Sequence, residues 1–496
     1  MMWLTQLLER NRQCRPGRAA LVDEERSVTW AEFHDRTLEL ARGLAELGIE
    51  RGDRVAVLSK DRIEVLESYF ALARLGALFV PLNHSLAEPE VAGIIERVGA
   101  VAVIGESELL DRHPELPASV RIRLALDKPA FEALGTLAAE RDLPEVADTD
   151  PIAVLHTSAT TGQAKGVTVD SGSFRAIALG WLVMARPTDD IVMVNCCPLY
   201  HGSMVVSLTY LAAGATVVLM PGFTPQRALT AVERHRATHM WLVPQMLRFM
   251  LQAKASHRTD LSCLREILYG AAPMPLDVYA DAVERLGCGF RQVYGMTEVG
   301  GPFVTLGPDE HPAPGDVTAR IPCGRVVPGM SARAVDGGGR ELPPGEIGEI
   351  VVRGPGVMRG YWNDPQATRE ITLDGCWIRT GDLGFLDDEG RISLVDRTKD
   401  VIIRAGQNVY PSEIERALLT HPAVRDAAVV GMPDEDYGEV PLAYVVPEPG
   451  ADPGAAALLG HVKGLLAPYK WPRRVEFIEQ VPRSPAGKIV KKLLRA

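Results

Sequence analysis

Leu155-His-Thr-Ser-Ala-Thr-Thr-Gly-Gln-Ala-Lys-Gly166 is a run of hydroxyl and small residues that begins where an apolar strand pattern, residues 152–155, ends. Short hydroxyl side chains bind phosphate oxygens, glycines allow backbone conformations that other residues resist, and a lysine adds positive charge. The stretch therefore predicts a loop that surrounds a triphosphate, although its spacing is not that of a Walker loop. An ordinary polar turn is the alternative. The candidate phosphate ligands are Thr157, Ser158, Thr160, Thr161, Gly162 and Lys165.

The length and composition of the chain limit the classes of protein to which it can belong. A chain of 496 residues exceeds the size at which one core stops growing, so we expect at least two domains. A net charge of −11 argues against a nucleic-acid-binding surface. Seven cysteines without a C-x-x-C pair are typical of reduced thiols. Charge lies too early for a signal peptide, and no apolar run could span a membrane, so we expect a cytoplasmic protein.

The first two thirds of the chain alternate helix and strand patterns. Thr29-Trp-Ala-Glu32 predicts a capping box, and leucines at helical spacing follow it as far as Gly48. A strand at 53–59, a helix at 62–75 and a strand at 78–82 then predict an α/β layer with mostly parallel strands. Further strands are expected at 101–104, 152–155, 191–195, 216–220, 239–243 and 267–269.

From about residue 323 the pattern changes to short strands separated by glycine and proline, which favours antiparallel pairing. A polar joint, Thr398-Lys-Asp400, precedes a compact α+β pattern with a helix at 412–419 and strands at 427–430 and 442–446. Two glycine clusters, at 336–339 and 354–356, miss the dinucleotide-binding spacing, so we expect no Rossmann cofactor.

Three later clusters add to the candidate phosphate loop. Tyr294-Gly-Met-Thr-Glu298 combines an aromatic ring, a hydroxyl and a carboxylate, which suit a purine, a phosphate and Mg²⁺. Asp382 and Arg397 suit ribose hydroxyls, and Lys488, in a tail that bears glycine, suits a mobile cation.

Together and in this order, these clusters resemble the adenylate-forming superfamily, which contains acyl-CoA synthetases, peptide synthetase adenylation domains and beetle luciferases. The match covers essentially the whole chain and is strongest at residues 390–415 and 482–488. The resemblance implies an α/β fold with a large N-terminal domain, residues 1–396, made of layered α/β subdomains and a small β-barrel-like subdomain. It also implies a hinge at 397–400 and a mobile small α+β domain at 401–496.

The resemblance further implies two half-reactions. A carboxylate attacks the α-phosphate of Mg·ATP to form an acyl-adenylate, and a thiol of coenzyme A or of a carrier protein then displaces AMP. Because the carboxylate and the triphosphate of ATP are both negatively charged, the reaction needs cations and dipoles that stabilise the charge of the transition state. The resemblance implies that residues 157–165 bind the β- and γ-phosphates, that Thr297 binds the α-phosphate and that Glu298 binds Mg²⁺. It implies that Asp382 and Arg397 bind ribose and that Lys488 catalyses adenylation. The residues implied to bind adenine and AMP are Gly270, Ala271, Ala272, Pro273, Tyr294, Gly295 and Met296.

Lys399 matches the hinge residue of the superfamily, and Ala405-Gly406 matches a path for pantetheine, with a plain turn as the alternative. The residues that match the acyl pocket are His201, which is also a catalytic candidate, Trp181, Gly202, Ser203, Val293 and Gly301, with Ala271 and Gly295 beside them. None is an acid that could hold an amino group, which favours an uncharged hydrophobic acid: fatty, aryl or alicyclic. Ala159 and Ala164 replace the glycine and proline that are common in this loop among relatives.

The leading hypothesis is therefore an ATP-dependent acyl-CoA ligase that works as a monomer or homodimer. One alternative delivers the acyl group to a separate carrier protein. Another is a non-catalytic relative that binds a nucleotide or acyl ligand, and the presence of Glu298, Asp382 and Lys488 argues against it. Nothing in the sequence marks a luciferase-like oxygenase.

Overall fold

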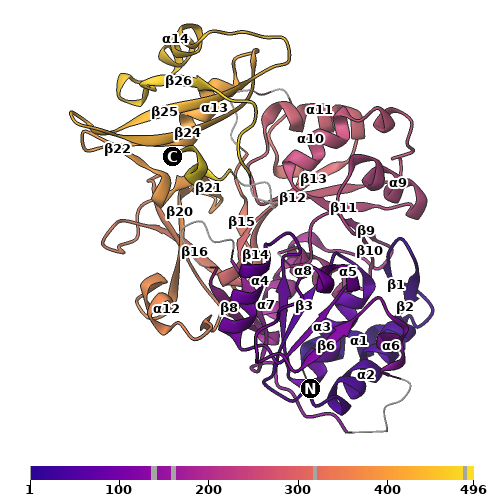
Figure 1. Cartoon of the computed structure of the whole chain (residues 1–496). Helices are drawn as coiled ribbons and strands as arrows, with labels where there is room; N and C mark the ends of the chain where they lie inside the picture. Colours follow the sequence, from indigo (N-terminus) through magenta and orange to yellow (C-terminus); the bar gives the residue numbers. More distant parts are fainter. Residues whose placement is uncertain are drawn as a thin grey trace. The chain divides into compact units, whose positions relative to one another are not determined.

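A computed structural model describes residues 2–135, 142–157, 164–200, 202–314, 316, 321–483 and 489–495, apart from the side chain of His257. The chain divides into two compact units (Figure 1). The first contains Met1–Ser331 and Arg353–Ile371, and the second contains Ala332–Val352 and Thr372–Ala496. The domain limits expected from the sequence, with a hinge at 397–400, remain a prediction.

The first unit is built on two mixed sheets in which most neighbouring strands are parallel. The nine-stranded sheet has the order β15 (Arg325–Val326), β14 (Gly301–Leu306), β13 (Gly289–Met296), β12 (Glu266–Gly270), β11 (His239–Leu242), β9 (Val192–Asn195), β10 (Thr216–Leu219), β1 (Ala19–Val22) and β2 (Ser27–Thr29). The seven-stranded sheet has the order β18 (Gly360–Tyr361), β8 (Gly166–Asp170), β7 (Pro151–His156), β4 (Leu78–Leu82), β3 (Arg54–Leu58), β5 (Ala102–Gly105) and β6 (Ile122–Ala125).

Helices follow most of these strands, which confirms the expected α/β class. They are α1 (Trp3–Cys14), α2 (Trp30–Glu46), α3 (Ile63–Leu75), α4 (Glu88–Val98), α5 (Ser107–Asp111), α6 (Pro129–Ala133), α7 (Ser171–Ala185), α8 (Ser203–Ala213), α9 (Pro225–His235), α10 (Pro244–Gln252), α11 (Leu276–Leu286) and α12 (Pro365–Ile371). Short 3₁₀ turns are η1 (Lys254–His257), η2 (Thr297–Val299) and η3 (Pro308–Glu310).

Local sequence signals explain several of these elements. The predicted capping box starts α2: the Thr29 hydroxyl accepts from the Glu32 N–H at 3.2 Å, and the Glu32 carboxylate accepts from the Thr29 N–H at 2.7 Å. This exchange satisfies two donors that the helix start leaves open. Apolar residues of β9, β11 and β12, such as Val194, Met240 and Ile267, form one core cluster with residues of α9, α10 and α11.

The second unit contains two smaller sheets. One joins β16 (Ser331–Val335), β17 (Gly348–Arg353), β20 (Trp377–Leu386) and β19 (Thr372–Leu373), with β21 (Ile392–Arg397) also on β20. The pairs that β20 makes with β17, β19 and β21 are antiparallel, as the glycine and proline pattern predicted.

The other sheet of this unit follows η4 (Thr398–Asp400) and has the order β23 (Gln407–Val409), β22 (Ile402–Arg404), β25 (Gly438–Pro447) and β24 (Val424–Asp434), with β26 (Arg474–Phe477) on β25. Residues of α13 (Pro411–Leu419) and α14 (Ala455–Leu465) share a core cluster with it, which confirms the expected α+β pattern. The 3₁₀ turns η5 (Pro468–Lys470) and η6 (Lys491–Leu494) complete the unit. Within the described parts of both units, no helix has the length and apolar character that a bilayer crossing requires.

Candidate active site

The candidate phosphate loop, residues 157–165, closes a β-hairpin in the first unit. Strands β7 and β8 pair antiparallel, with His156 opposite Gly166, and the Thr157 N–H donates to the Lys165 carbonyl at 3.1 Å. Both ends of the loop are therefore anchored at the same sheet edge. The sequence pattern predicted β7 but missed β8. Residues 158–163 lie outside the described residues, so the roles expected for Ser158, Thr160, Thr161 and Gly162, and the effect of Ala159, stay predictions.

A third strand places an aromatic ring beside this hairpin. Strand β18 pairs antiparallel with β8, with Tyr361 opposite Val167, and the Trp362 N–H donates to the Gly166 carbonyl at 2.7 Å. Lys165 Nζ lies 4.9 Å from the centroid of the Tyr361 ring. This is within the range of a cation–π contact, so the ring helps to hold the lysine.

The same tyrosine reaches the carboxylate expected to bind metal. Tyr361 Oη donates a hydrogen bond to Glu298 Oε1 at 2.7 Å, and the Met358 N–H donates to the Glu298 carbonyl at 2.8 Å. Burial first, and then the nearby Glu298 charge, raise the pKa of Tyr361, so its hydroxyl remains a donor. Lys165 and Glu298, two predicted site residues, thus meet at one ring.

Sequence reasoning missed Tyr361. The available signal was an aromatic pair, Tyr361-Trp362, directly after Gly360. A strand of two residues is too short for a periodic pattern, and only its pairing with β8 identifies it.

Glu298 has the chemistry of a magnesium ligand. The side chain is half-buried in η2, and its Oε2 atom accepts no hydrogen bond from a described residue. Mg²⁺ usually binds through one or two carboxylates together with substrate phosphates and water, so a single carboxylate beside a phosphate loop fits the ion. The described residues contain no group of three or more histidine, cysteine or acidic side chains that could hold a metal without substrate.

The two clusters expected around adenine lie on adjacent strands. β12 ends at Gly270, opposite Val293 of β13. A Cβ atom at Gly270 would lie 2.5 Å from the Val293 carbonyl oxygen and 3.2 Å from the Trp241 ring, so only glycine fits. Ala271 follows with a φ of +66°, which turns residues 271–273 away from the strand direction. The Tyr294 ring lies 5.3 Å from the Phe303 ring, centroid to centroid.

Residues expected at the acyl pocket come from α7, the start of α8, β13 and β14. Trp181 is buried and its indole N–H donates to the Pro302 carbonyl at 2.9 Å. A Cβ atom at Gly301 would lie 2.9 Å from Val205 of α8, so β14 and α8 approach closely here. Gly202 is exposed at the start of α8. The Ser203 hydroxyl donates to the Cys197 carbonyl at 2.6 Å, so it is used within the chain itself. His201 lies outside the described residues.

The expected ribose pair lies in the second unit. Asp382 on β20 and Arg397 on β21 are direct partners in the sheet register, with Asp382 Oδ1 3.4 Å from Arg397 Nε. The Asp382 N–H donates to the Thr380 hydroxyl at 3.1 Å, and that hydroxyl donates to the Ile350 carbonyl at 2.7 Å. These bonds fix the backbone that carries the carboxylate.

Two hydrogen bonds in the second unit join residues before the expected hinge, residues 397–400, to a residue after it. The Ser412 N–H donates to Asp396 Oδ2 at 2.9 Å, and the Ser412 hydroxyl donates to the Val395 carbonyl. The acceptors precede η4 and the donor follows it. Burial, and then the charge of Arg397, lower the pKa of Lys399. Lys488 lies outside the described residues, so its predicted role is untested.

Ala405-Gly406 forms the two-residue turn between β22 and β23, where Arg404 is opposite Gln407. Both turn residues have positive φ, +48° and +80°, as a type I′ hairpin turn requires. The turn is exposed, and the Ala405 N–H donates to the Tyr437 carbonyl at 2.8 Å. This geometry agrees with the plain turn considered from the sequence and does not test the pantetheine path.

The chain matches known proteins along nearly its full length. A family model described as AMP-binding enzyme matches residues 8–362, and one described as AMP-binding enzyme C-terminal domain matches residues 413–488. A fatty acid–acyl-carrier-protein ligase of Streptomyces coeruleorubidus is 36% identical, with 99% of this chain and 96% of the relative covered. A feruloyl-CoA synthase of Amycolatopsis sp is 37% identical, with 97% and 96% covered.

Solved structures of adenylate-forming enzymes have the same fold along nearly the whole chain. The crystal structure of ATP-bound MatB from Rhodopseudomonas palustris has a TM-score of 0.91 and 30% identity, with 100% of this chain and 98% of that chain covered. The fold and these matches define a nucleotide-dependent ligase. The chain belongs to the AMP-binding enzyme family, and it is an AMP-forming acid–thiol ligase.

Proposed function

We propose that this enzyme joins an uncharged hydrophobic carboxylic acid, of the fatty, aryl or alicyclic class, to coenzyme A through an acyl-adenylate. The contact of Lys165 and Glu298 with one ring, that of Tyr361, carries the proposal. It brings a cation from the phosphate loop and a carboxylate suited to Mg²⁺ to the same place, and a triphosphate needs both to neutralise its charge.

The other residues take the roles that the resemblance implies. Residues 157–165 bind the β- and γ-phosphates, Thr297 binds the α-phosphate, and Glu298 would hold Mg²⁺. Asp382 and Arg397 bind ribose, and Lys488 supplies positive charge to the attacking carboxylate and the α-phosphate during adenylation. The acid needs such help because a free carboxylate has no good leaving group, and AMP provides one.

The proposed acyl class follows from the side chains expected around the acid. Trp181 and Val293 are apolar and buried, and Gly301 has no side chain. A second charge on the acid would be desolvated there without an opposite charge, at a large cost in free energy. The relatives named for feruloyl and fatty acyl groups support the same class.

A second candidate acceptor is a separate carrier protein, because one relative is named as an acyl-carrier-protein ligase. We further propose that the enzyme works in the cytoplasm, as a monomer or homodimer. Its seven cysteines, all within the described residues, form no disulfide, which suits a reducing compartment.

Mass spectrometry of products tests the proposal. Purified protein is incubated with Mg·ATP and a panel of fatty, aryl, alicyclic and amino acids, each with and without coenzyme A. We expect acyl-CoA from at least one uncharged acid and none from the amino acids. Acyl-adenylate that persists with coenzyme A present would instead favour the carrier protein, and absence of both products from every acid would contradict the proposed function.

Lys488→Ala tests the division into two half-reactions. We expect this variant to lose most adenylation but to convert supplied acyl-adenylate and coenzyme A to product at nearly the wild-type rate. Equal loss of both half-reactions would contradict the role proposed for Lys488.

A further inference from the structure

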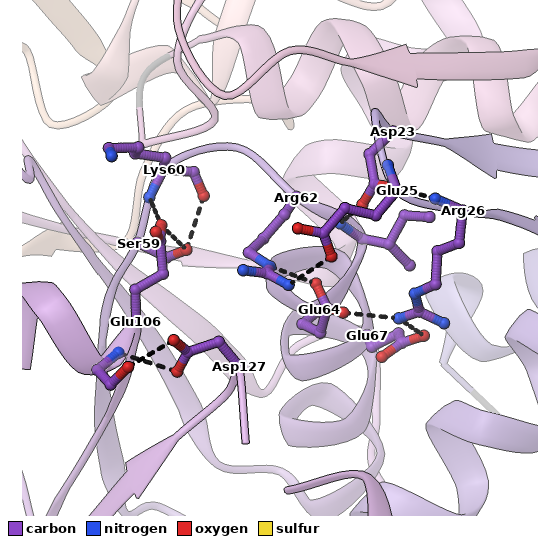
Figure 2. A network of polar contacts seen from close by, with 12 residues as sticks. Asp23, Glu25, Arg26, Ser59, Lys60, Arg62, Glu64, Glu67, Glu106 and Asp127 are labelled. Carbon is purple, nitrogen blue, oxygen red and sulfur yellow. Dashed lines mark hydrogen bonds and ion pairs between the residues drawn. The ribbon is translucent and has the colours of Figure 1, made fainter. Parts of the chain in front are cut away.

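The loop between β3 and α3, residues 59–62, is held on both sides by acidic side chains (Figure 2). The Lys60 N–H donates to Glu106 Oε1 at 2.6 Å, and Arg62 Nε donates to Glu64 Oε2 at 2.6 Å. Glu106 directly follows β5, the strand that pairs with β3, and Glu64 lies in the first turn of α3. The Ile63 N–H also donates to Asp23 Oδ2 at 3.3 Å, so a backbone N–H on either side of Asp61 is bound by a carboxylate.

Asp61 faces inward from this loop and is 7% exposed. Its Oδ1 atom accepts a hydrogen bond from the Leu199 N–H at 2.9 Å. Leu199 lies in the connection between β9 and α8, residues 196–202, which belongs to the nine-stranded sheet. One hydrogen bond thus joins a fixed loop of one sheet to a connection of the other.

That connection leads into the expected acyl pocket. Its first part is fixed locally, because the Cys197 N–H donates to Asn195 Oδ1 at 3.1 Å and the Cys197 carbonyl accepts from Ser203. Leu199 is fixed by Asp61. The next residue, Tyr200, is buried with its ring 5.7 Å from that of His84, and His201 follows it in the sequence.

The space around Asp61 excludes direct contact with an acyl group. A cavity of about 10 Å³ lies between Asp61, Leu199, Tyr200 and the end of β4. This volume is at the lower limit for one water molecule. Asp61 therefore acts on any substrate only through the connection that it holds.

We propose that Asp61 is a positioning residue for the acid substrate: by accepting from the Leu199 N–H, it holds Tyr200 and the connection that leads to α8, where the acyl pocket is expected. The proposal rests on the proposed function, because it assumes that this connection borders the acid. It assigns to Asp61 an effect on binding of the acid, with binding of ATP unchanged.

Three variants test the proposal. Asp61→Asn keeps an acceptor oxygen of the same shape, whereas Asp61→Leu keeps the shape and removes the acceptor. Asp127→Asn is the matched control, because Asp127 belongs to the same region but binds Ser107 at the start of α5 (Figure 2). If Asp61→Leu does not yield folded protein, Asp61→Ala takes its place.

We expect Asp61→Leu to raise the KM for the acid about tenfold, because a buried N–H without a partner is costly. The KM for Mg·ATP should change less than about twofold, and Asp61→Asn and Asp127→Asn should resemble the wild type. A folded Asp61→Leu enzyme with the wild-type KM for the acid would overturn the proposal, as would equal impairment of Asp61→Asn.

Amide hydrogen exchange tests the positioning role of Asp61 independently of the proposed acyl-CoA ligase activity. In Asp61→Leu, the amide of Leu199 should exchange at least about tenfold faster than in the wild type, with or without substrate. Unchanged exchange would overturn the positioning role. Wild-type protein that forms no acyl-adenylate from any acid would instead contradict the proposed function, and would remove the pocket that Asp61 is proposed to serve.

Discussion

Tyr361 and Glu298 are 63 positions apart in the sequence, yet Tyr361 Oη donates to Glu298 Oε1 at 2.7 Å. The tyrosine is held next to the phosphate loop because β18 pairs with β8. A single side chain thus links the proposed metal ligand to the lysine of the loop.

Tyr361→Phe should weaken use of Mg·ATP, because it removes the hydroxyl and keeps the ring beside Lys165. A hydrogen bond to a charged group is worth about 1.5–3 kcal/mol, so the Mg²⁺ concentration for half-maximal adenylation should rise roughly ten- to hundredfold. Pyrophosphate exchange at varied Mg²⁺ measures this. Tyr279→Phe, which removes a hydroxyl bound to the Pro312 carbonyl, is the control. An unchanged Mg²⁺ requirement in Tyr361→Phe would show that Glu298 needs no such support.

Asp61 should make stability depend on pH. Burial raises its pKa from 3.8 to about 8, although the Leu199 N–H partly opposes the shift. Between these values the folded chain holds a proton that the unfolded chain has released. The contribution of Asp61 to the free energy of unfolding is therefore full below pH 4 and declines as the pH rises toward 8.

Asp61→Asn should remove that decline, so its stability relative to wild type should increase from pH 4.5 to pH 8, as measured by urea unfolding. The comparison with wild type is needed because His156 and His239, with pKa values lowered by burial to about 4, change stability in the opposite direction below pH 6.5.

Other titratable groups lie close to Asp61. Cys197 and Tyr200 face Asp61 from the β9–α8 connection, with pKa values raised by burial and by Asp61 itself. On its own loop, the neighbours Lys60 and Arg62 are positively charged. Parallel curves for variant and wild type would contradict the raised pKa.

Ser412→Ala should alter the balance between the half-reactions. The Ser412 hydroxyl donates to the Val395 carbonyl across the predicted hinge, and rotation at Lys399 would break this bond. Loss of a hydrogen bond worth about 1 kcal/mol should shift the ratio of the two single-turnover rates roughly fivefold. Thr420→Ala, which removes a hydroxyl bond within α13 and its end, is the control.

Lys399→Pro tests the hinge itself. The substitution should slow the complete reaction more than adenylation alone, because proline restricts the backbone at the expected point of rotation. Wild-type rates for the complete reaction in this variant would place the rotation elsewhere.

Ala405→Asn should stabilise the protein by about 0.5–1 kcal/mol, because asparagine tolerates the left-handed conformation that Ala405 adopts at a φ of +48°. Chemical unfolding measures the change, and Ala405→Val should act in the opposite direction. If the turn borders pantetheine, Ala405→Asn should also raise the KM for coenzyme A and leave adenylation unchanged. An unaltered KM would support a purely structural turn.

Elements with a strong local pattern were predictable from the sequence. The strand at 78–82 and the helix at 62–75 correspond to β4 and α3 because apolar periodicity and Gly76 mark them. Strands β8 and β18 were missed, since their existence depends on pairing between distant segments. Lys165 and Glu298 were predicted from the residue types of their clusters, and the resemblance then implied their roles. Asp61 could not be, because an acid between lysine and arginine has the pattern of an exposed turn until tertiary structure buries it.

The β7–β8 hairpin holds the backbone of Lys165 separately from the hydroxyl residues of the candidate phosphate loop, so the two can be varied independently by mutation. The backbone of Lys165 is attached to the sheet through its bond with Thr157 and the pairing of Gly166. We therefore expect substitutions at positions 158–163 to change the proposed hydroxyl ligands while the lysine stays beside the Tyr361 ring. Libraries confined to those six positions would explore nucleotide affinity without disturbing the framework of the site.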